Sequence, residues 1–298
     1  MILAFLATID LFMYWQPSAK GDEILSQPLL AQIRKSVEIQ SWDLDKGEIE
    51  NTTVFWSLGP RMKTFDFASV PKEKLVLFLW EPPTVEPEGY DLVQHFGKVY
   101  TWDDDLVDNV KFFKFYYPEL QSRGEVVPFK KKKFCCMVAR KQKSKHPKEL
   151  YSERLRVIRY FEGKKGFDLY GKGWKKGKGA IPDKKAVIRE YKFTFSYENM
   201  KDVKGYVTEK MFDCFAAGTV PIYWGASNIT DYVPERCFVD RRKFKNEKEL
   251  VRFLAKMSPE TYQGYLDCAE EFLKSDQAQL FSVENFVKIF QTIQNPSS

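Results

Sequence analysis

The sequence predicts two α/β domains, each built on a parallel β-sheet with helices on its faces. Three observations support this fold class. The chain has 298 residues, enough for two domains of ordinary size. Apolar residues make up 44% of it, which is typical of a globular protein with a large core. Short strand-like runs alternate with helix-like segments, a pattern that favours parallel sheets covered on both faces.

The elements follow from local periodicity. Strand-like runs occupy residues 2–9, 37–42, 53–58, 75–80, 99–102, 134–139, 167–170, 193–197, 220–224 and 237–239. Helix-like segments occupy residues 25–35, 149–161, 186–190, 207–217, 247–256, 259–274 and 282–294. The lysine-rich stretch 130–133 interrupts this pattern and predicts a domain boundary. We therefore expect domains at residues 1–132 and 133–298, and the last helix could pack back on the first domain.

The composition argues against several kinds of site. Only two histidines occur, too few to suggest a zinc site or a Ser-His-Asp triad. The five cysteines show no CxxC spacing and favour reduced, buried cysteines over a disulfide framework. The aspartates at 103–105 match the metal-binding D-x-D pattern, but Asp after a strand more often forms a turn. No metal site is predicted.

The charge pattern indicates an anionic partner. Net charge is +6, and lysines cluster at 130–133, 141–148 and 171–179. Such clusters suit a phosphate-bearing substrate, an anionic membrane surface or nucleic acid, and the alternative is solvated loops. Nucleic acid is not predicted, because RNA-binding aromatic signatures and helix-turn-helix spacing are not visible. The apolar residues 1–15 are too few to span a bilayer and predict a first buried strand rather than a signal segment.

The most informative segment is residues 191–225. It predicts a strand, a polar loop, a helix from 207 to 217 and a second strand. Thr208 is a candidate N-cap and Gly218 a candidate C-terminal stop. Lys210 would then lie in the first helical turn, where it opposes the helix dipole unless an anion is present. The segment therefore predicts either an anion site, such as one for a diphosphate, or a solvated lysine.

Two further features predict ligand contacts. Glu81 follows the continuously apolar run 75–80 and precedes two prolines, so we expect it at the carboxyl edge of a sheet. Ligands bind at that edge in open α/β sheets, and Glu81 could act there as a general base. The alternative is a loop glutamate in an ion pair. In the helix at 149–161, one of Arg154, Arg156 and Arg159 could point at a phosphate, because arginine forks suit phosphate oxygens.

The chain resembles the α1,3/4-fucosyltransferases. The family hallmark is similar to YKFTFSYEN at 191–199 and to GYVTEKMFDCFAAGTVPIYWG at 205–225. LFLWEPP at 77–83 resembles the strand that carries the family's catalytic acid. ERLRVIRYF at 153–161 and FDLYG at 167–171 resemble the start of its donor domain. The resemblance implies the GT-B fold, in which two Rossmann-like domains face a cleft. It also implies an inverting, metal-independent transfer of L-fucose from GDP-β-L-fucose.

The resemblance also implies roles for individual residues. Glu81 matches the general base. Arg154 and Lys210 match the residues that hold the diphosphate, with Arg156 as an alternative register for Arg154. Further donor-site positions match Asn199, Tyr206 and Glu209. Lys192 matches a family lysine whose role is less defined. The leaving diphosphate would be stabilised by Arg154, Lys210 and the helix start near Thr208.

The remaining expectations concern partners and location. The resemblance implies a GlcNAc-containing glycan as acceptor and an α1,3 linkage, with no cofactor beyond the donor substrate. A transferase using another nucleotide sugar and a non-catalytic polyanion binder are the alternatives. We expect a cytoplasmic protein in which the lysine clusters can contact an anionic membrane surface. The alternative location is the Golgi lumen.

Overall fold

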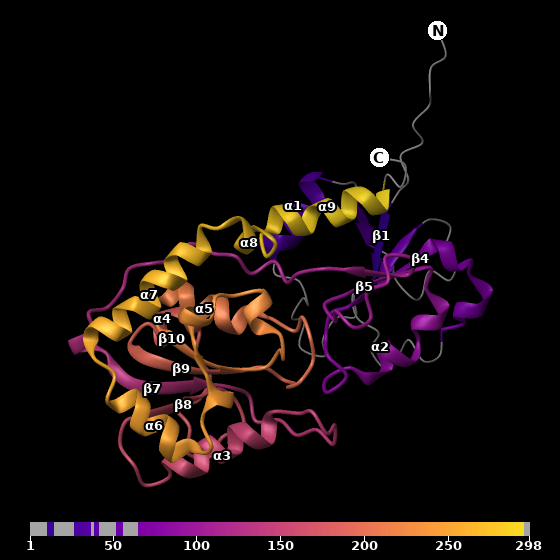
Figure 1. Ribbon diagram of the computed structural model, residues 1–298. Helices are drawn as coiled ribbons and strands as arrows, with labels where there is room; N and C mark the ends of the chain where they lie inside the picture. Colours follow the sequence, from indigo (N-terminus) through magenta and orange to yellow (C-terminus); the bar gives the residue numbers. More distant parts are fainter. Residues whose placement is uncertain (1–10, 15–26, 37–38, 42–51, 56–64, 295–298) are drawn as a thin grey trace. The chain divides into compact units, whose positions relative to one another are not determined.

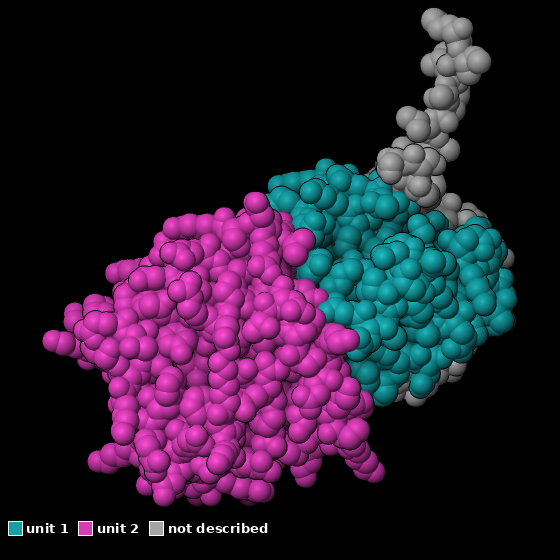
Figure 2. Space-filling view, viewed as in Figure 1, with its two compact units in different colours: residues 1–116, 283–298 teal, residues 117–282 magenta. Residues whose placement is uncertain are grey.

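The computed structural model describes residues 11–14, 27–36, 39–41, 52–55 and 65–294 (Figure 1). The strand predicted at 2–9 lies outside these residues. The described chain divides into two units, residues 1–116 with 283–298 and residues 117–282, which Figure 2 colours separately. The division therefore falls after residue 116 instead of after residue 132, and the last helix belongs to the first unit. No described helix is both long enough and apolar enough to span a membrane.

The first unit contains a six-stranded parallel sheet in the order β2-β1-β3-β4-β5-β6. Its strands are β1 (Leu11–Tyr14), β2 (Ile39–Ser41), β3 (Thr53–Phe55), β4 (Leu75–Leu79), β5 (Lys98–Thr101) and β6 (Phe112–Lys114). Its helices are α1 (Gln27–Ser36), α2 (Pro87–Asp91) and α9 (Val283–Gln294).

Strand β4 forms the centre of this unit. All five of its residues are buried, as a strand covered on both faces requires. The Phe78 ring stacks on Tyr100 of β5 at 4.9 Å between centroids and on Phe290 of α9 at 5.6 Å. This aromatic packing explains why the last helix belongs to the first unit.

The second unit contains a five-stranded parallel sheet in the order β11-β10-β9-β7-β8. Its strands are β7 (Lys133–Val138), β8 (Phe167–Tyr170), β9 (Tyr191–Tyr197), β10 (Val220–Trp224) and β11 (Val239–Asp240). Its helices are α3 (Tyr151–Phe161), α4 (Lys184–Ile188), α5 (Glu209–Ala217), α6 (Glu247–Ala255), α7 (Pro259–Leu273) and α8 (Asp276–Gln279). Two parallel-sheet α/β units confirm the predicted fold class.

In the second unit the order in which strands join the parallel sheet reverses at β7. The chain runs from β7 outward to β8 and then returns to place β9 on the other side of β7. Helices α3 and α6 lie on one face of the sheet, and α4 and α5 lie on the other (Figure 1). Such a switch point leaves a crevice at the carboxyl ends of the two strands, where ligands of open α/β sheets bind.

Strand β9 shows how the alternating sequence serves both faces. Phe193, Phe195 and Tyr197 belong to one core cluster with residues of α3 and α6. Ser196 instead faces α5, because its hydroxyl lies 3.3 Å from the Lys210 carbonyl oxygen. Helix α5 ends at Gly218, whose φ of 66° is left-handed and favours glycine. The predicted alternation and helix stop are therefore confirmed.

Lys132 is buried, although the sequence left open that its lysine cluster is a solvated loop. Its side-chain ammonium donates to the carbonyl oxygens of Arg189 at 2.5 Å and Gly218 at 2.9 Å, and more weakly to Tyr191 at 3.4 Å. These three carbonyls belong to the end of α4, the start of β9 and the end of α5. Lys132 thus connects three chain segments by hydrogen bonds at the amino end of the sheet.

We expect Lys132→Met to destabilise the protein by about 1–3 kcal/mol, because buried carbonyls lose their charged donor. Urea unfolding monitored by circular dichroism would measure this. Lys131→Met is the matched control, since Lys131 is exposed, and its cost should stay within about 0.5 kcal/mol. Equal stability of the two variants would contradict the structural role of Lys132.

Candidate functional site

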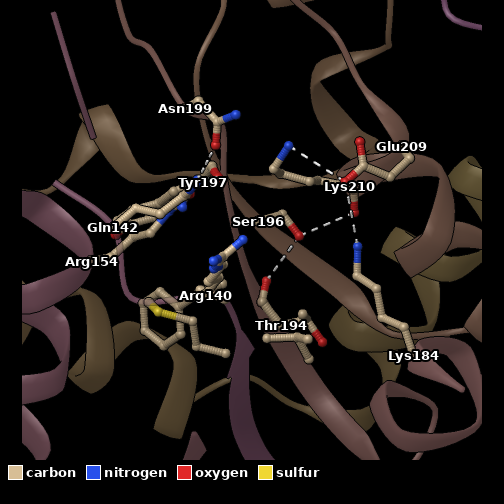
Figure 3. A pocket seen from close by; sticks show the side chains of 14 residues that line it. Arg140, Gln142, Arg154, Lys184, Thr194, Ser196, Tyr197, Asn199, Glu209 and Lys210 are labelled. Carbon is tan, nitrogen blue, oxygen red and sulfur yellow. Dashed lines mark hydrogen bonds and ion pairs between the residues drawn. The ribbon is translucent and has the colours of Figure 1, made fainter. Parts of the chain in front are cut away.

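A cavity of about 230 Å³ lies at the switch point of the second unit (Figure 3). Its wall comes from the carboxyl ends of β7 and β9 and from residues of α3, α4 and α5. The lining residues are Met137, Val138, Ala139, Arg140, Gln142, Arg154, Lys184, Thr194, Phe195, Ser196, Tyr197, Asn199, Glu209 and Lys210. Four of these side chains are basic and one is acidic, so the cavity suits an anion.

Arg154 of α3 is fixed at one side of the cavity. Its Nη2 donates to the carbonyl oxygens of Tyr197 and Glu198, both at 2.8 Å, and to Asn199 Oδ1 at 3.0 Å. The guanidinium carbon lies 5.1 Å from the centre of the Tyr151 ring. Among the described residues, no hydrogen bond uses its Nε or Nη1. One edge of the guanidinium is thus anchored, and the other donors remain available to a ligand.

Burial distinguishes Arg154 from its neighbours on the helix. Arg154 is 6% exposed and lines the cavity, whereas Arg156 has a 63% exposed side chain paired with Glu153 at 3.0 Å. Arg159 is also exposed. The sequence left Arg156 open as an alternative register, and the structure places Arg154 at the cavity.

Lys210 of α5 lines the cavity through a side chain that is 19% exposed. Its Nζ lies 2.9 Å from Glu198 Oε2, donates to Thr208 Oγ1 at 2.9 Å and lies 3.5 Å from Glu209 Oε1. Burial by itself would lower the pKa of Lys210, but Glu198 and Glu209 raise it above its ordinary value. The ammonium is therefore charged across the physiological pH range.

Glu198 follows β9, and its carboxylate lies at the start of α5. Its side chain is fully buried, and its Oε1 accepts from the Thr208 backbone N–H at 3.0 Å. Its Oε2 accepts from the Thr208 hydroxyl at 2.8 Å. The sequence left either an anion site or a solvated lysine at this helix start, and in the structure the anion beside Lys210 is Glu198 of the protein itself. The Thr208 N–H is therefore used by Glu198, and a role of the rest of the helix start in holding a diphosphate stays a prediction.

Glu209 and Lys184 form a charged rim beside Lys210. Lys184 Nζ lies 2.7 Å from Asp213 Oδ2 and 3.8 Å from Glu209 Oε1. Burial raises the pKa of Glu209, but Lys210 and Lys184 outweigh it and hold that pKa at about 2. Figure 3 shows Arg154 and Gln142 on one side of the view and Lys184 and Glu209 on the other.

The predicted donor residues are only partly brought together. Arg154, Asn199, Glu209 and Lys210 line one cavity. Tyr206 is 2% exposed and does not line it; its carbonyl oxygen accepts from the Tyr223 hydroxyl at 3.2 Å.

Lys192 also lies away from the cavity lining. It is near the amino end of β9, where its Nζ lies 3.7 Å from the centre of the Phe129 ring. Because ligands meet the carboxyl end of a parallel strand, this position gives Lys192 no direct part in the cavity.

Glu81 and the aspartates at 103–105 belong to the first unit. Glu81 follows β4 at its carboxyl end, as predicted, and its backbone oxygen accepts from the Tyr90 hydroxyl at 3.4 Å. Asp103 accepts from the Asp105 N–H at 3.0 Å, and Lys114 pairs with Asp104 at 2.6 Å, so this run forms a turn. Within the described part of the chain, no group of three His, Cys, Asp or Glu residues forms a metal-binding cluster.

Sequence reasoning missed several polar lining residues, among them the two cationic side chains Arg140 and Lys184. Arg140 and Gln142 follow β7, and Lys184 starts α4. Arg140 and Lys184 lie in or beside lysine-rich stretches, where composition does not separate a ligand from a solvated residue. Glu198 was also missed, although it lies directly before Asn199 in the segment that the resemblance matched. Its position at the end of a strand and before a helix was the available signal.

We expect Arg154→Met to weaken GDP binding by at least about tenfold, the value of one charge-assisted hydrogen bond. Isothermal titration calorimetry with GDP would measure the affinity. Arg156→Met is the matched control, because it removes an exposed arginine from the same helix and should leave the affinity unchanged. A loss confined to Arg156→Met would show that the register is reversed.

Comparison with known proteins identifies related sequences. A sequence model of glycosyltransferase family 10 (fucosyltransferase), C-terminal part, matches residues 127–297. An alpha-(1,4)-fucosyltransferase of Arabidopsis thaliana is 42% identical over 80 residues, 26% of this chain and 20% of that protein. The alpha-(1,3)-fucosyltransferase FucT of Helicobacter pylori is 32% identical over 91 residues, 30% of this chain and 19% of that protein.

Other relatives match over a longer span. A 4-galactosyl-N-acetylglucosaminide 3-alpha-L-fucosyltransferase 9 of Mus musculus is 27% identical over 211 residues, 69% of this chain and 55% of that protein. The matched region thus spans between about a fifth and about half of the length of these curated relatives.

Solved structures share the fold. A crystal structure of an alpha1,3-fucosyltransferase with GDP-fucose superposes with a TM-score of 0.62 at 18% identity, covering 98% of this chain and 91% of that one. A DNA-modifying beta-glucosyltransferase superposes with a TM-score of 0.58 at 10% identity, covering 96% of this chain and all of that one. At these identities the likeness shows the fold alone, and that fold is the GT-B arrangement of two parallel-sheet units.

Proposed function

Because the chain belongs to glycosyltransferase family 10, the fucosyltransferases, we propose that it transfers L-fucose from GDP-β-L-fucose to a glycan. The proposed acceptor is a hydroxyl of a GlcNAc-containing glycan, and the proposed linkage is α1,3. One observation carries the donor part of the proposal. At the switch-point cavity, Arg154 presents unused donors and Lys210 presents a charged ammonium, which together suit a diphosphate.

The proposed reaction is a single displacement with inversion at the fucose carbon. The acceptor hydroxyl attacks that carbon, the bond to GDP breaks, and Glu81 accepts the hydroxyl proton. The departing diphosphate gains negative charge, which Arg154 and Lys210 stabilise without a metal ion. Both side chains are held before the ligand arrives, Arg154 by backbone carbonyls and Lys210 by Glu198. Such preorganised charges lower the barrier without reorganisation during the reaction.

Incubation with labelled GDP-fucose and a panel of small glycans, with and without EDTA, would test this function. We expect a fucosylated product from a GlcNAc-containing acceptor, with inverted configuration and an unchanged rate in EDTA. UDP-glucose belongs in the donor panel, because a glucosyltransferase solved with uridine diphosphoglucose shares the fold. Transfer from UDP-glucose and not from GDP-fucose would favour another nucleotide sugar as the donor.

We also propose a peripheral contact with an anionic membrane, in keeping with a cytoplasmic location. The loops after β7 and β8 carry exposed lysines, and the Lys141 N–H donates to the Lys172 carbonyl oxygen at 3.0 Å. These two paired loops bring their positive charges together, as binding to anionic lipid requires. We expect co-sedimentation with phosphatidylserine vesicles that high salt abolishes. Equal sedimentation with phosphatidylcholine vesicles would contradict the proposal.

A further inference from the structure

Glu198 is a carboxylate with 0% exposure, held between the start of α5 and the Lys210 ammonium. Its two oxygens accept from the Thr208 N–H at 3.0 Å and the Thr208 hydroxyl at 2.8 Å, and Lys210 Nζ lies 2.9 Å from Oε2. It does not line the cavity, whereas Lys210 does. The Glu198 carboxylate therefore acts on the cavity through Lys210, while its backbone carbonyl oxygen accepts from Arg154 at 2.8 Å.

The backbone leaves space for this carboxylate. The Glu198 N–H donates to the Trp224 carbonyl oxygen at 2.8 Å, which brings the end of β9 against the end of β10. A Cβ atom at Gly225 would lie 2.4 Å from Glu198 Cγ and 2.5 Å from the Tyr223 hydroxyl. Gly225 is thus needed at this position because Glu198 packs against it. A buried charge with its own space and three polar contacts indicates a specific role.

We propose that Glu198 is a positioning residue for the donor diphosphate, because it fixes the place and the charge of the Lys210 ammonium at the cavity wall. This inference rests on the proposed function, since it assigns Glu198 to the same donor site. The carboxylate has two effects on Lys210. It directs one N–H of the ammonium inward, which leaves the others for Thr208 and for a ligand. It also keeps the ammonium protonated in a buried setting.

The effect of Glu198 on the protonation of Lys210 can be distinguished from a general structural role by its pH dependence. Burial lowers the pKa of Lys210, Glu198 and Glu209 raise it, and Arg154 and Lys184 lower it. The charged groups that face this ammonium are Glu198 after β9, Glu209 on α5, Arg154 on α3 and Lys184 on α4. More remotely lies Glu119, whose pKa burial raises to about 8. Without the charge of Glu198, burial and the two cations should lower the pKa of Lys210.

Glu198→Gln tests this with little change of shape. A glutamine has a single acceptor oxygen, so in either orientation its amide NH₂ faces a donor: the Thr208 N–H, or the Thr208 hydroxyl and Lys210. We expect GDP affinity at pH 7 to fall by at least about tenfold, as for a lost charge-assisted hydrogen bond. We also expect the alkaline loss of GDP affinity to occur at lower pH than in the wild type. Calorimetry with GDP from pH 7 to pH 10 would measure both, with exposed Glu162→Gln as the matched control.

The outcomes separate the two proposals. If the wild type does not bind GDP, the proposed function and this inference both fail. If the wild type binds GDP and Glu198→Gln matches it in affinity and in alkaline midpoint, only the inference fails. A weaker affinity with an unshifted midpoint would show a merely structural role and would also overturn it. If Glu198→Gln does not fold, Thr208→Val removes one contact of Glu198 and should give a smaller shift in the same direction.

Discussion

Glu81→Gln is expected to bind GDP normally and to lose turnover by about 10²- to 10⁴-fold, the usual contribution of a general base. Glu81 follows Trp80 just after β4, and Pro82 and Pro83 prevent the strand from continuing. The turn after it is fixed by the Val85 N–H, which donates to the Pro82 carbonyl oxygen at 2.8 Å. The backbone of Glu81 therefore lies at the carboxyl edge of the sheet.

Initial rates of fucose transfer and calorimetry with GDP would measure the two quantities separately. Glu73→Gln is the matched control, because Glu73 is an exposed glutamate at the amino end of the same strand and should leave turnover unchanged. Near-normal turnover of Glu81→Gln would show that Glu81 is not the general base. A parallel loss of GDP binding would place Glu81 in the donor site instead.

Lys210→Met is expected to reduce both GDP affinity and stability. GDP affinity should fall by at least about tenfold, because the ligand loses a charged donor. The free energy of unfolding should fall by about 3–5 kcal/mol, because Glu198 is left as a buried charge without its cation. Calorimetry and urea unfolding would measure these effects.

The double variant Lys210→Met with Glu198→Gln separates the two effects. Removing both charges should recover most of the stability, since a neutral pair has no uncompensated charge, but it should not recover GDP affinity. Lys248→Met is the matched control. Helix α6 begins Glu247-Lys248 as α5 begins Glu209-Lys210, but Lys248 is exposed. A double variant that binds GDP like the wild type would show that Lys210 does not contact the ligand.

Local patterns predicted much of the fold and part of the site. The alternation in β9, the Gly218 stop and the apolar run before Glu81 each depend on residues close in sequence. The same holds for the turn at residues 103–105, because Asp after a strand accepts hydrogen bonds from its own backbone. Such features are local, so the sequence was sufficient to find them.

The local sequence patterns did not predict which side chains point into the protein and which point to solvent. Arg154 and Arg156 are two residues apart on one helix, and only packing against the end of β9 buries the first. Lys132 belongs to a cluster of four lysines, but it alone among them is buried against carbonyl groups from three segments. Tyr206 belongs to the best-matched segment, yet its side chain is buried outside the cavity lining.

The sequence by itself determined the fold class and the family hallmark, and it left Lys210 either beside an anion or in solvent. Only the tertiary structure decided between these two. The anion beside Lys210 is Glu198, because strand β9 brings its carboxylate to Thr208 and Lys210. Periodicity and capping depend on neighbours within a few residues, whereas the partner of a buried charge depends on how distant segments pack.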